Sequence, residues 1–196
     1  MLVLVRHGQS ELNAAGRLAG RLDTPLTELG VVQAKAMSAS LADLGEPVEV
    51  ISSPLRRARD TAAAIGLPVV VDERWIELDY GPYDGQLLGD VPAEMWARWR
   101  SDASYTPPGG ESLAALGRRV REACEELLGD PDRLTVVVSH VSPIKAGVAW
   151  ALGVGDEVAW RMFLAPASIT MIGHGAAGPS LYAFNVTSHL VGVATG

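Results

Sequence analysis

The stretch that decides the fold is LVLVRHG, at residues 2–8. Its first four residues form an apolar run that predicts a buried β-strand. In open α/β sheets, ligands bind just beyond the carboxyl ends of the strands, so Arg6 and His7 lie where chemistry is usually done. Gly8 lets the backbone turn sharply and approach a ligand closely. A fixed cation beside an imidazole suits attack on an anion such as a phosphate ester, whereas the alternative is an ordinary strand end with a surface arginine.

The rest of the chain alternates predicted strands with predicted helices. Further strands are expected at residues 48–52, 69–71, 134–138, 169–172 and 181–185. Helices are expected at residues 27–44, 55–65, 93–100, 111–128 and 143–152. Thr27 is the expected N-cap of the first helix, and Gly30 in its first turn is a weak point of that assignment. The alternation predicts an α/β protein with a largely parallel sheet and helices on both faces.

Composition is typical of one globular domain over residues 1–196. The chain is 48% hydrophobic and carries a net charge of −7. That charge disfavours a nucleic-acid-binding surface, but it is compatible with an anionic substrate held by local arginines. The single cysteine, Cys124, lies in a helical pattern and predicts a buried thiol rather than a disulfide framework. No run reaches 18 uncharged apolar residues, so we expect no membrane span. Arg6 and His7 interrupt the first apolar run after five residues, which predicts no signal peptide. The lack of a disulfide framework is compatible with the cytoplasmic location that we expect.

Residues 75–110 are the longest irregular stretch and are rich in glycine and proline. Loops of this length are usually functional lids or walls, so we expect this segment to cap one side of the site. Its short predicted helix carries Trp96 and Trp99 together with Arg98 and Arg100. Whether these two arginines, or Glu111 just beyond the segment, contact a substrate is left open.

Two of the four histidines follow predicted strands directly. These are His7 and His140, and in a parallel sheet both would reach one cleft at the same edge. His174 and His189 lack this context. Arg57 begins the helix after the strand at 48–52, where backbone amides also favour an anion. Guanidinium groups bind phosphate oxygens through two parallel hydrogen bonds, so this set of residues favours a phosphate site. The alternatives are two unrelated strand-end histidines and a solvated basic face made of Arg56, Arg57 and Arg59.

Six ordered segments carry a resemblance to the histidine phosphatase superfamily, which contains cofactor-dependent phosphoglycerate mutases and many phosphatases. They are LVRHGQSELN (4–13), DTPLTELG (23–30), SSPLRRARDTA (52–62), IELDYGPYDG (76–85), PPGGESL (107–113) and VSHVSPIKA (138–146). The match covers nearly the whole chain. It implies a phosphoglycerate mutase-like, three-layer αβα fold. It departs from many members at Val141, where glycine usually follows the second histidine.

The resemblance also implies roles for five of these residues. It makes His7 the nucleophile that forms a phosphohistidine, with one ring nitrogen free and the other held by a hydrogen bond. Arg6 and Arg57 would bind the equatorial phosphate oxygens, and Asn13 would donate from its amide. His140 would stabilise charge on the transferring group.

The leaving alkoxide needs a proton, and the resemblance assigns this role to Glu77, which would afterwards act as general base for water. The residues alone do not separate Glu77 from three neighbouring acids, Glu73, Asp79 and Asp84. No metal or other cofactor is expected, since the chain has no HExxH motif and no cysteine–histidine cluster.

The segments SHVSPIKA and FNVTSHL (184–190) resemble the phosphatase branch, in particular α-ribazole phosphatase-like domains, including those fused to ribonuclease H in actinobacteria. We therefore expect a bacterial phosphomonoester hydrolase that acts on a small metabolite, and the chain is compatible with an excised domain of such a fusion. A phosphoglycerate mutase and a non-catalytic phosphate-binding module are the alternatives. A mutase would need further cations, for which Arg98 and Arg100 are candidates. The sequence does not fix the oligomeric state, and a homodimer is compatible with it.

Overall fold

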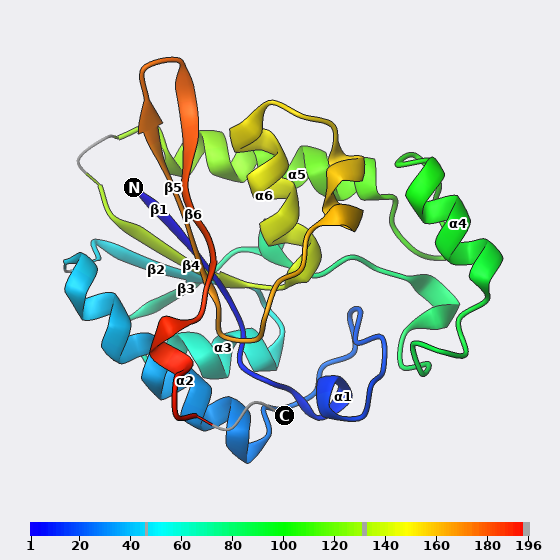
Figure 1. Cartoon of the computed structure of the whole chain (residues 1–196), viewed down its shortest axis with the longest axis horizontal. Coiled ribbons are helices and arrows are strands. Elements are labelled where there is room, and N and C mark those ends of the chain that lie inside the picture. Colours follow the sequence, from blue (N-terminus) through cyan, green and yellow to red (C-terminus); the bar gives the residue numbers. More distant parts are fainter. Residues whose placement is uncertain (46, 131–132, 194–196) are drawn as a thin grey trace.

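A six-stranded sheet runs through the middle of the protein (Figure 1). The computed structural model describes residues 1–45, 47–130 and 133–193. The strands are β1 (Leu2–Arg6), β2 (Glu49–Ser52), β3 (Val69–Val71), β4 (Thr135–Ser139), β5 (Ile169–Gly175) and β6 (Gly178–Val186). Their order across the sheet is β3-β2-β4-β1-β5-β6.

The central strands are parallel, as expected. β1 pairs with β4, and β4 pairs with β2, in parallel register. Arg6 lies opposite Ser139, so the carboxyl ends of β1 and β4 meet at one edge of the sheet. β5 and β6 add an antiparallel hairpin. The turn between them is too short for the crossover that parallel strands require.

Helices cover both faces of the sheet. The α-helices are α1 (Glu11–Ala14), α2 (Glu28–Leu41), α3 (Arg56–Ala63), α4 (Ala93–Ser101), α5 (Leu113–Leu127) and α6 (Val141–Leu152). Short 3-10 turns are η1 (Ala42–Leu44), η2 (Glu73–Trp75), η3 (Gly81–Tyr83), η4 (Asp156–Arg161) and η5 (Ser188–Leu190). Figure 1 shows α2 and α3 on one face, and α5 and α6 on the other. The predicted three-layer arrangement is confirmed.

The alternation of side chains along β1 explains its continuous apolar sequence. Leu2 and Leu4 pack into a core with residues of α5 and α6. Val3 and Val5 pack into a second core with residues of α2 and α3. All four side chains are fully buried. A strand covered on both faces has no position for a polar residue until it reaches the sheet edge, which is where Arg6 and His7 follow.

The last long helix begins earlier than its proline signal predicted. Proline favours the first helical turn, which placed the start at Pro143. In the structure α6 begins at Val141, with His140 as its N-cap residue. Pro143 is therefore the third helical residue, where its missing N–H removes no intrahelical bond. The helix thus starts directly at the second strand-end histidine.

Gly30 sits in the first turn of α2 because two backbone segments touch there. A Cβ on Gly30 would lie 2.1 Å from the carbonyl oxygen of Gln9, and a Cβ on Gly8 would lie 2.4 Å from the carbonyl oxygen of Gly30. Thr27 caps the helix as expected, accepting a hydrogen bond from the Gly30 amide. This mutual approach holds the segment after β1 against α2. The need for Gly8 is therefore close packing rather than a left-handed backbone.

We expect Gly30→Ala to lower the free energy of unfolding by about 1–3 kcal/mol, despite the better helix propensity of alanine, because the added methyl overpacks a backbone contact. Urea unfolding of the purified protein measures this change. Gly89→Ala is the matched control, since a Cβ at Gly89 would meet nothing within 4 Å. Equal stability of the two variants would contradict the packing argument.

Candidate active site

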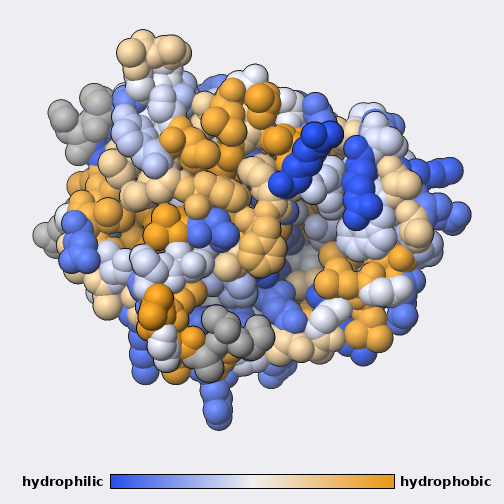
Figure 2. Space-filling view, viewed as in Figure 1, coloured by the Kyte–Doolittle hydropathy of each residue, from blue (hydrophilic) through white to orange (hydrophobic). Residues whose placement is uncertain are grey.

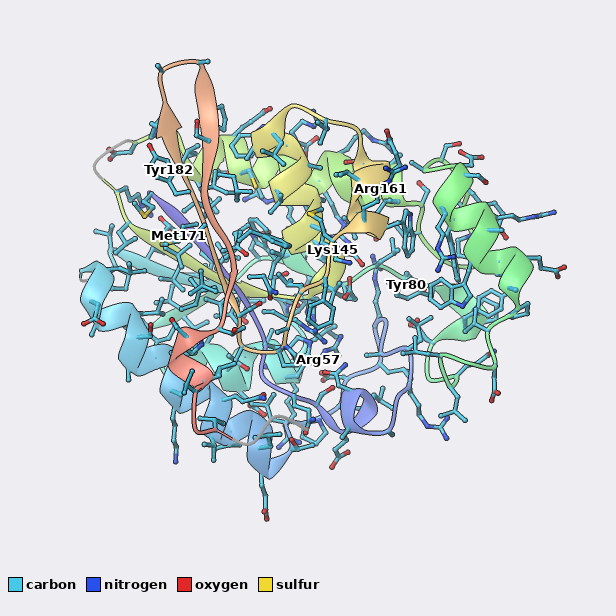
Figure 3. All side chains as sticks on the ribbon, in the orientation of Figure 1. Arg57, Tyr80, Lys145, Arg161, Met171 and Tyr182 are labelled. Atoms are coloured by element: carbon cyan, nitrogen blue, oxygen red, sulfur yellow. The ribbon has the colours of Figure 1, made fainter. Side chains whose placement is uncertain are left out.

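A pocket of about 180 Å³ opens at the sheet edge where β1 and β4 end. It is lined by Arg6, His7, Asn13, Arg17, Leu18, Ala19, Gly20, Arg57, Glu77, Tyr80, Leu88 and Val141. Figure 3 labels two of these residues, Arg57 and Tyr80. A larger groove of about 560 Å³ is lined mainly by apolar residues near the C-terminal segment, and hydrophobic residues gather on that face in Figure 2. Of these two, the smaller pocket is lined by the ionisable side chains of Arg6, His7, Arg57 and Glu77, and it is therefore the candidate site.

His7 lies buried at the floor of the pocket with a defined ring orientation. Its Nδ1 lies 2.6 Å from the carbonyl oxygen of Gly8, which can only accept, so Nδ1 carries the proton. Nε2 then bears the lone pair and accepts a hydrogen bond from Nε of Arg57 at 3.2 Å. Burial, with Arg57 and Arg6 nearby, holds the pKa of His7 well below its ordinary value. His7 is therefore a neutral imidazole at neutral pH, with Nε2 unprotonated.

Arg57 is fully buried and joins two parts of the site. Besides its contact with His7, its terminal nitrogens donate to the carbonyl oxygens of Gly20 and Leu22, each at 2.7 Å. A guanidinium has five N–H groups, so these three bonds leave two for an anion. The sequence predicted a phosphate ligand at this position. The structure adds that Arg57 also closes the loop at residues 20–22 over the pocket.

Arg6 supplies the second cation. It donates to the carbonyl oxygen of Leu164, and it lines the pocket beside His7. Burial lowers the pKa of Arg6 to about 10, with Arg57 also lowering it and Glu77 opposing the shift. The side chain stays charged at neutral pH. Two guanidinium groups from different parts of the sequence therefore face one small cavity.

His140 stands beside His7 as the sequence predicted. The two ring centroids are 5.0 Å apart, with the rings at 61°. Nε2 of His140 lies 2.7 Å from Oγ of Ser53, at the end of β2. His140 is fully buried, and burial, Arg57 and His7 hold its pKa well below the ordinary value. Both imidazoles are therefore neutral in the free protein.

Of the four acids that the sequence left as candidates, Glu77 lines the pocket. Asp79 pairs with Arg21, Asp84 accepts from the amides of Arg21 and Tyr80, and Glu73 is exposed.

The carboxylate of Glu77 accepts three backbone N–H bonds. The donors are Leu78 at 2.8 Å and the first two residues of α6, Val141 and Ser142, at 3.2 Å each. The side chain therefore satisfies amides that the start of a helix leaves unpaired. It also ties the segment after η2 to the segment after β4.

Asn13 reaches the pocket from α1. Its Oδ1 accepts hydrogen bonds from the amide and the hydroxyl of Ser10, at 3.2 and 3.0 Å, which completes a capping box. The acceptor end of the amide is therefore held by the helix start. The donor end, Nδ2, is left for another acceptor. This orientation suits the donor role that the resemblance implies.

A half-buried ion network behind Glu77 was not predicted from the sequence. Arg21 and Arg119 both donate to the carbonyl oxygen of Glu77, at 3.2 and 3.4 Å. Glu111 pairs with both arginines, at 3.0 and 2.8 Å. Glu111 therefore holds the backbone of Glu77 and does not reach the pocket. In the sequence, Glu111 was singled out only by its place in the PPGGESL segment. No feature of the sequence singled out Arg21 or Arg119.

A family model described as the histidine phosphatase superfamily (branch 1) matches residues 2–187. The chain belongs to the histidine phosphatase superfamily. A bifunctional protein of Mycobacterium tuberculosis is 41% identical over 187 residues, covering 91% of this chain and 51% of that protein. The chain thus spans about half the length of that relative.

Two further members of the superfamily have named substrates. A glucosyl-3-phosphoglycerate phosphatase of Mycobacterium tuberculosis is 40% identical over 162 residues, covering 74% of this chain and 72% of that protein. A phosphoserine phosphatase from Entamoeba histolytica, solved with phosphoserine, has a TM-score of 0.87 and 26% identity, covering 96% of this chain and 98% of that one.

The segment at residues 75–110 forms one wall of the pocket through Glu77, Tyr80 and Leu88. Its two arginines do not join that wall. Arg98 and Arg100 are exposed on α4, and the Arg98 guanidinium lies 5.6 Å from the ring centre of Tyr105. Arg17, which the sequence did not single out, lines the pocket instead and donates to the carbonyl oxygen of Gly85 at 2.7 Å.

Across residues 1–45, 47–130 and 133–193, no helix has the length and apolar character needed to cross a bilayer. The same residues contain no group of three or more His, Cys, Asp or Glu side chains arranged to hold a metal ion. Cys124 is buried and unpaired with another cysteine, and burial raises the pKa of its thiol.

The buried imidazoles predict how stability depends on pH. In the unfolded chain a histidine takes up a proton below about pH 6.5, whereas His7 and His140 resist protonation in the folded state. The unfolded state therefore binds more protons in this range, so the free energy of unfolding falls as the pH drops below about 6.5. Urea titrations at several pH values measure the slope.

A His7→Gln/His140→Gln double variant should show a shallower slope than the wild type. Asp84, whose pKa burial raises to about 6, acts in the opposite direction, because its contribution is lost as the pH rises. It is present in both proteins, so the difference between the two slopes isolates the histidines. Parallel slopes would show that these imidazoles are not held neutral.

Proposed function

We propose that the protein is a phosphomonoester hydrolase that works through a phosphohistidine on His7. The observation that carries the proposal is the lone pair on Nε2 of a neutral imidazole, which accepts from Arg57 in a pocket that Arg6 also lines. The pocket volume of about 180 Å³ lies below the range of sites for drug-sized ligands, which favours a small phosphorylated metabolite.

In the first step, Nε2 of His7 attacks phosphorus, and the bond between phosphorus and the ester oxygen breaks. The Nε–H of Arg57, which donates to the Nε2 lone pair in the free protein, turns to a phosphate oxygen. Arg6 and the amide of Asn13 donate to the same phosphate group. These donors stabilise the charge that is spread over the equatorial oxygens. His140, buried against His7, supports the same charge. The electron pair of the broken bond leaves on the alkoxide.

The alkoxide takes its proton from Glu77. In the second step, Glu77 accepts a proton from water, which attacks the phosphohistidine. The P–N bond breaks, its electron pair returns to Nε2, and phosphate leaves.

Hydrolysis is favoured over the mutase alternative by where the cations lie. Arg98 and Arg100, the candidates for binding a mutase substrate, are exposed on α4. The named relatives are phosphatases of small phosphomonoesters, which supports the same choice. The complete set of Arg6, His7, Arg57 and His140 disfavours a non-catalytic phosphate-binding module.

We also propose that residues 1–196 act as one domain, since the family match runs nearly from end to end. The bifunctional relative, of which the chain spans about half, supports a fused context for such a domain. A cytoplasmic location is supported by a single buried cysteine, which leaves no disulfide within the chain. The homodimer and the ribonuclease H partner stay predictions.

His7→Ala should lower kcat/KM for p-nitrophenyl phosphate by more than about 10³-fold, because it removes the attacking nitrogen. Steady-state release of p-nitrophenol measures this loss. His174→Ala is the matched control, since His174 is exposed on β5. Activity of His7→Ala within a few-fold of the wild type would reject the proposed mechanism.

Glu77→Gln should separate substrates by their leaving groups. The amide keeps an acceptor for the α6 amides and cannot give a proton, so hydrolysis of an alkyl phosphate should slow by about 10²-fold or more. p-Nitrophenolate needs little protonation, so p-nitrophenyl phosphate should be affected much less. The comparison uses kcat/KM, which reports the first step and not the shared hydrolysis of the phosphohistidine. Equal losses in kcat/KM on both substrates would remove Glu77 as the acid.

A further inference from the structure

Helix α6 has one open stripe near the pocket. From Ser142 to Ala149 every side chain except Lys145 is buried, and Val141, one helical turn before Lys145, lines the pocket. Residues four apart lie on the same face of a helix, about 6 Å along its axis. The open side of this turn therefore runs from the pocket wall to Lys145. Figure 3 labels Lys145 on α6, in the same view as Arg57 and Tyr80.

Lys145 is half-buried, and its ammonium group has no hydrogen bond or ion pair within the described part of the chain. It is close enough to the catalytic groups to feel both Glu77 and Arg6 electrostatically. Removing a charge from water without pairing it costs free energy. The chain has one other lysine, Lys35, which is exposed on α2. An unpaired cation one helical turn from Val141 in the pocket wall is a reason to look for an anion that arrives with the substrate.

We propose that Lys145 binds a carboxylate on the alcohol part of the substrate, so that the preferred substrates are phosphate esters of small hydroxy acids. This inference rests on the proposed phosphatase function. The phosphate would lie between Arg6 and Arg57, and the second anion about one helical turn away, a distance that two or three carbon atoms span. A second phosphate in place of the carboxylate fits less well, because its larger negative charge would be repelled more strongly by the carboxylate of Glu77.

The competing explanation is that the aliphatic stem of Lys145 covers apolar surface while its charge only seeks water. In that case methionine, which keeps an unbranched apolar side chain, would leave every substrate equally well hydrolysed. The two explanations therefore differ in substrate preference rather than in stability.

The test uses two esters that share three carbons and one phosphate, 3-phosphoglycerate and glycerol 3-phosphate. They differ in a carboxylate that replaces a hydroxymethyl group. The wild type should prefer 3-phosphoglycerate in kcat/KM, and Lys145→Met should reduce that preference about 10-fold or more, mainly through KM. Lys145→Arg should retain most of it. Lys35→Met is the control and should leave it unchanged, and all variants should hydrolyse p-nitrophenyl phosphate within about two-fold of the wild type.

Three outcomes overturn the proposal: a wild type without the preference, equal loss by Lys145→Met on both esters, or no loss on either. In each of these cases, wild-type activity on p-nitrophenyl phosphate leaves the phosphatase function standing. If the wild type hydrolyses none of these esters, the proposed function fails, and the role of Lys145 fails with it.

Discussion

A neutral imidazole held against a guanidinium is the interaction on which the site depends. Nδ1–H of His7 donates a hydrogen bond to the carbonyl oxygen of Gly8, which leaves Nε2 to accept from Arg57. Two cations and burial then keep the ring from taking up a second proton. The same cations that disfavour imidazolium would attract a phosphate. Electrostatics therefore holds the candidate nucleophile unprotonated and prepares its cavity for an anion.

The fold supplies this interaction by bringing strand ends together. β1 delivers Arg6 and His7, β4 delivers His140, and β2 leads into the helix that carries Arg57. The parallel pairing of these strands sets all of them at one edge of the sheet. Around this edge, side chains fix loops through backbone groups: Arg57 holds residues 20–22, and Glu77 holds the start of α6. The hydrogen bonds that position the side chains of the site therefore also hold the surrounding loops in place.

Much of this arrangement was predictable from the sequence, because strand periodicity and the strand-end residues are local signals. The positions of β1, β4 and α2 and the meeting of His7 with His140 followed from them. The start of α6 did not, since it depends on a carboxylate 64 residues earlier, Glu77. The ion network of Arg21, Glu111 and Arg119 was equally hidden, because three long side chains meet only after the chain has folded. Gly30 weakens the helix prediction because glycine has a low helix propensity. The sequence does not show the close contact with the backbone of Gln9 that requires a glycine there.

The central claim is most directly tested by ¹⁵N NMR of the His7 ring in the free protein at neutral pH. The account predicts a neutral ring with the proton on Nδ1, giving one protonated-type and one unprotonated-type nitrogen signal, the latter from Nε2. A charged imidazolium, or a neutral ring with its proton on Nε2, would contradict it.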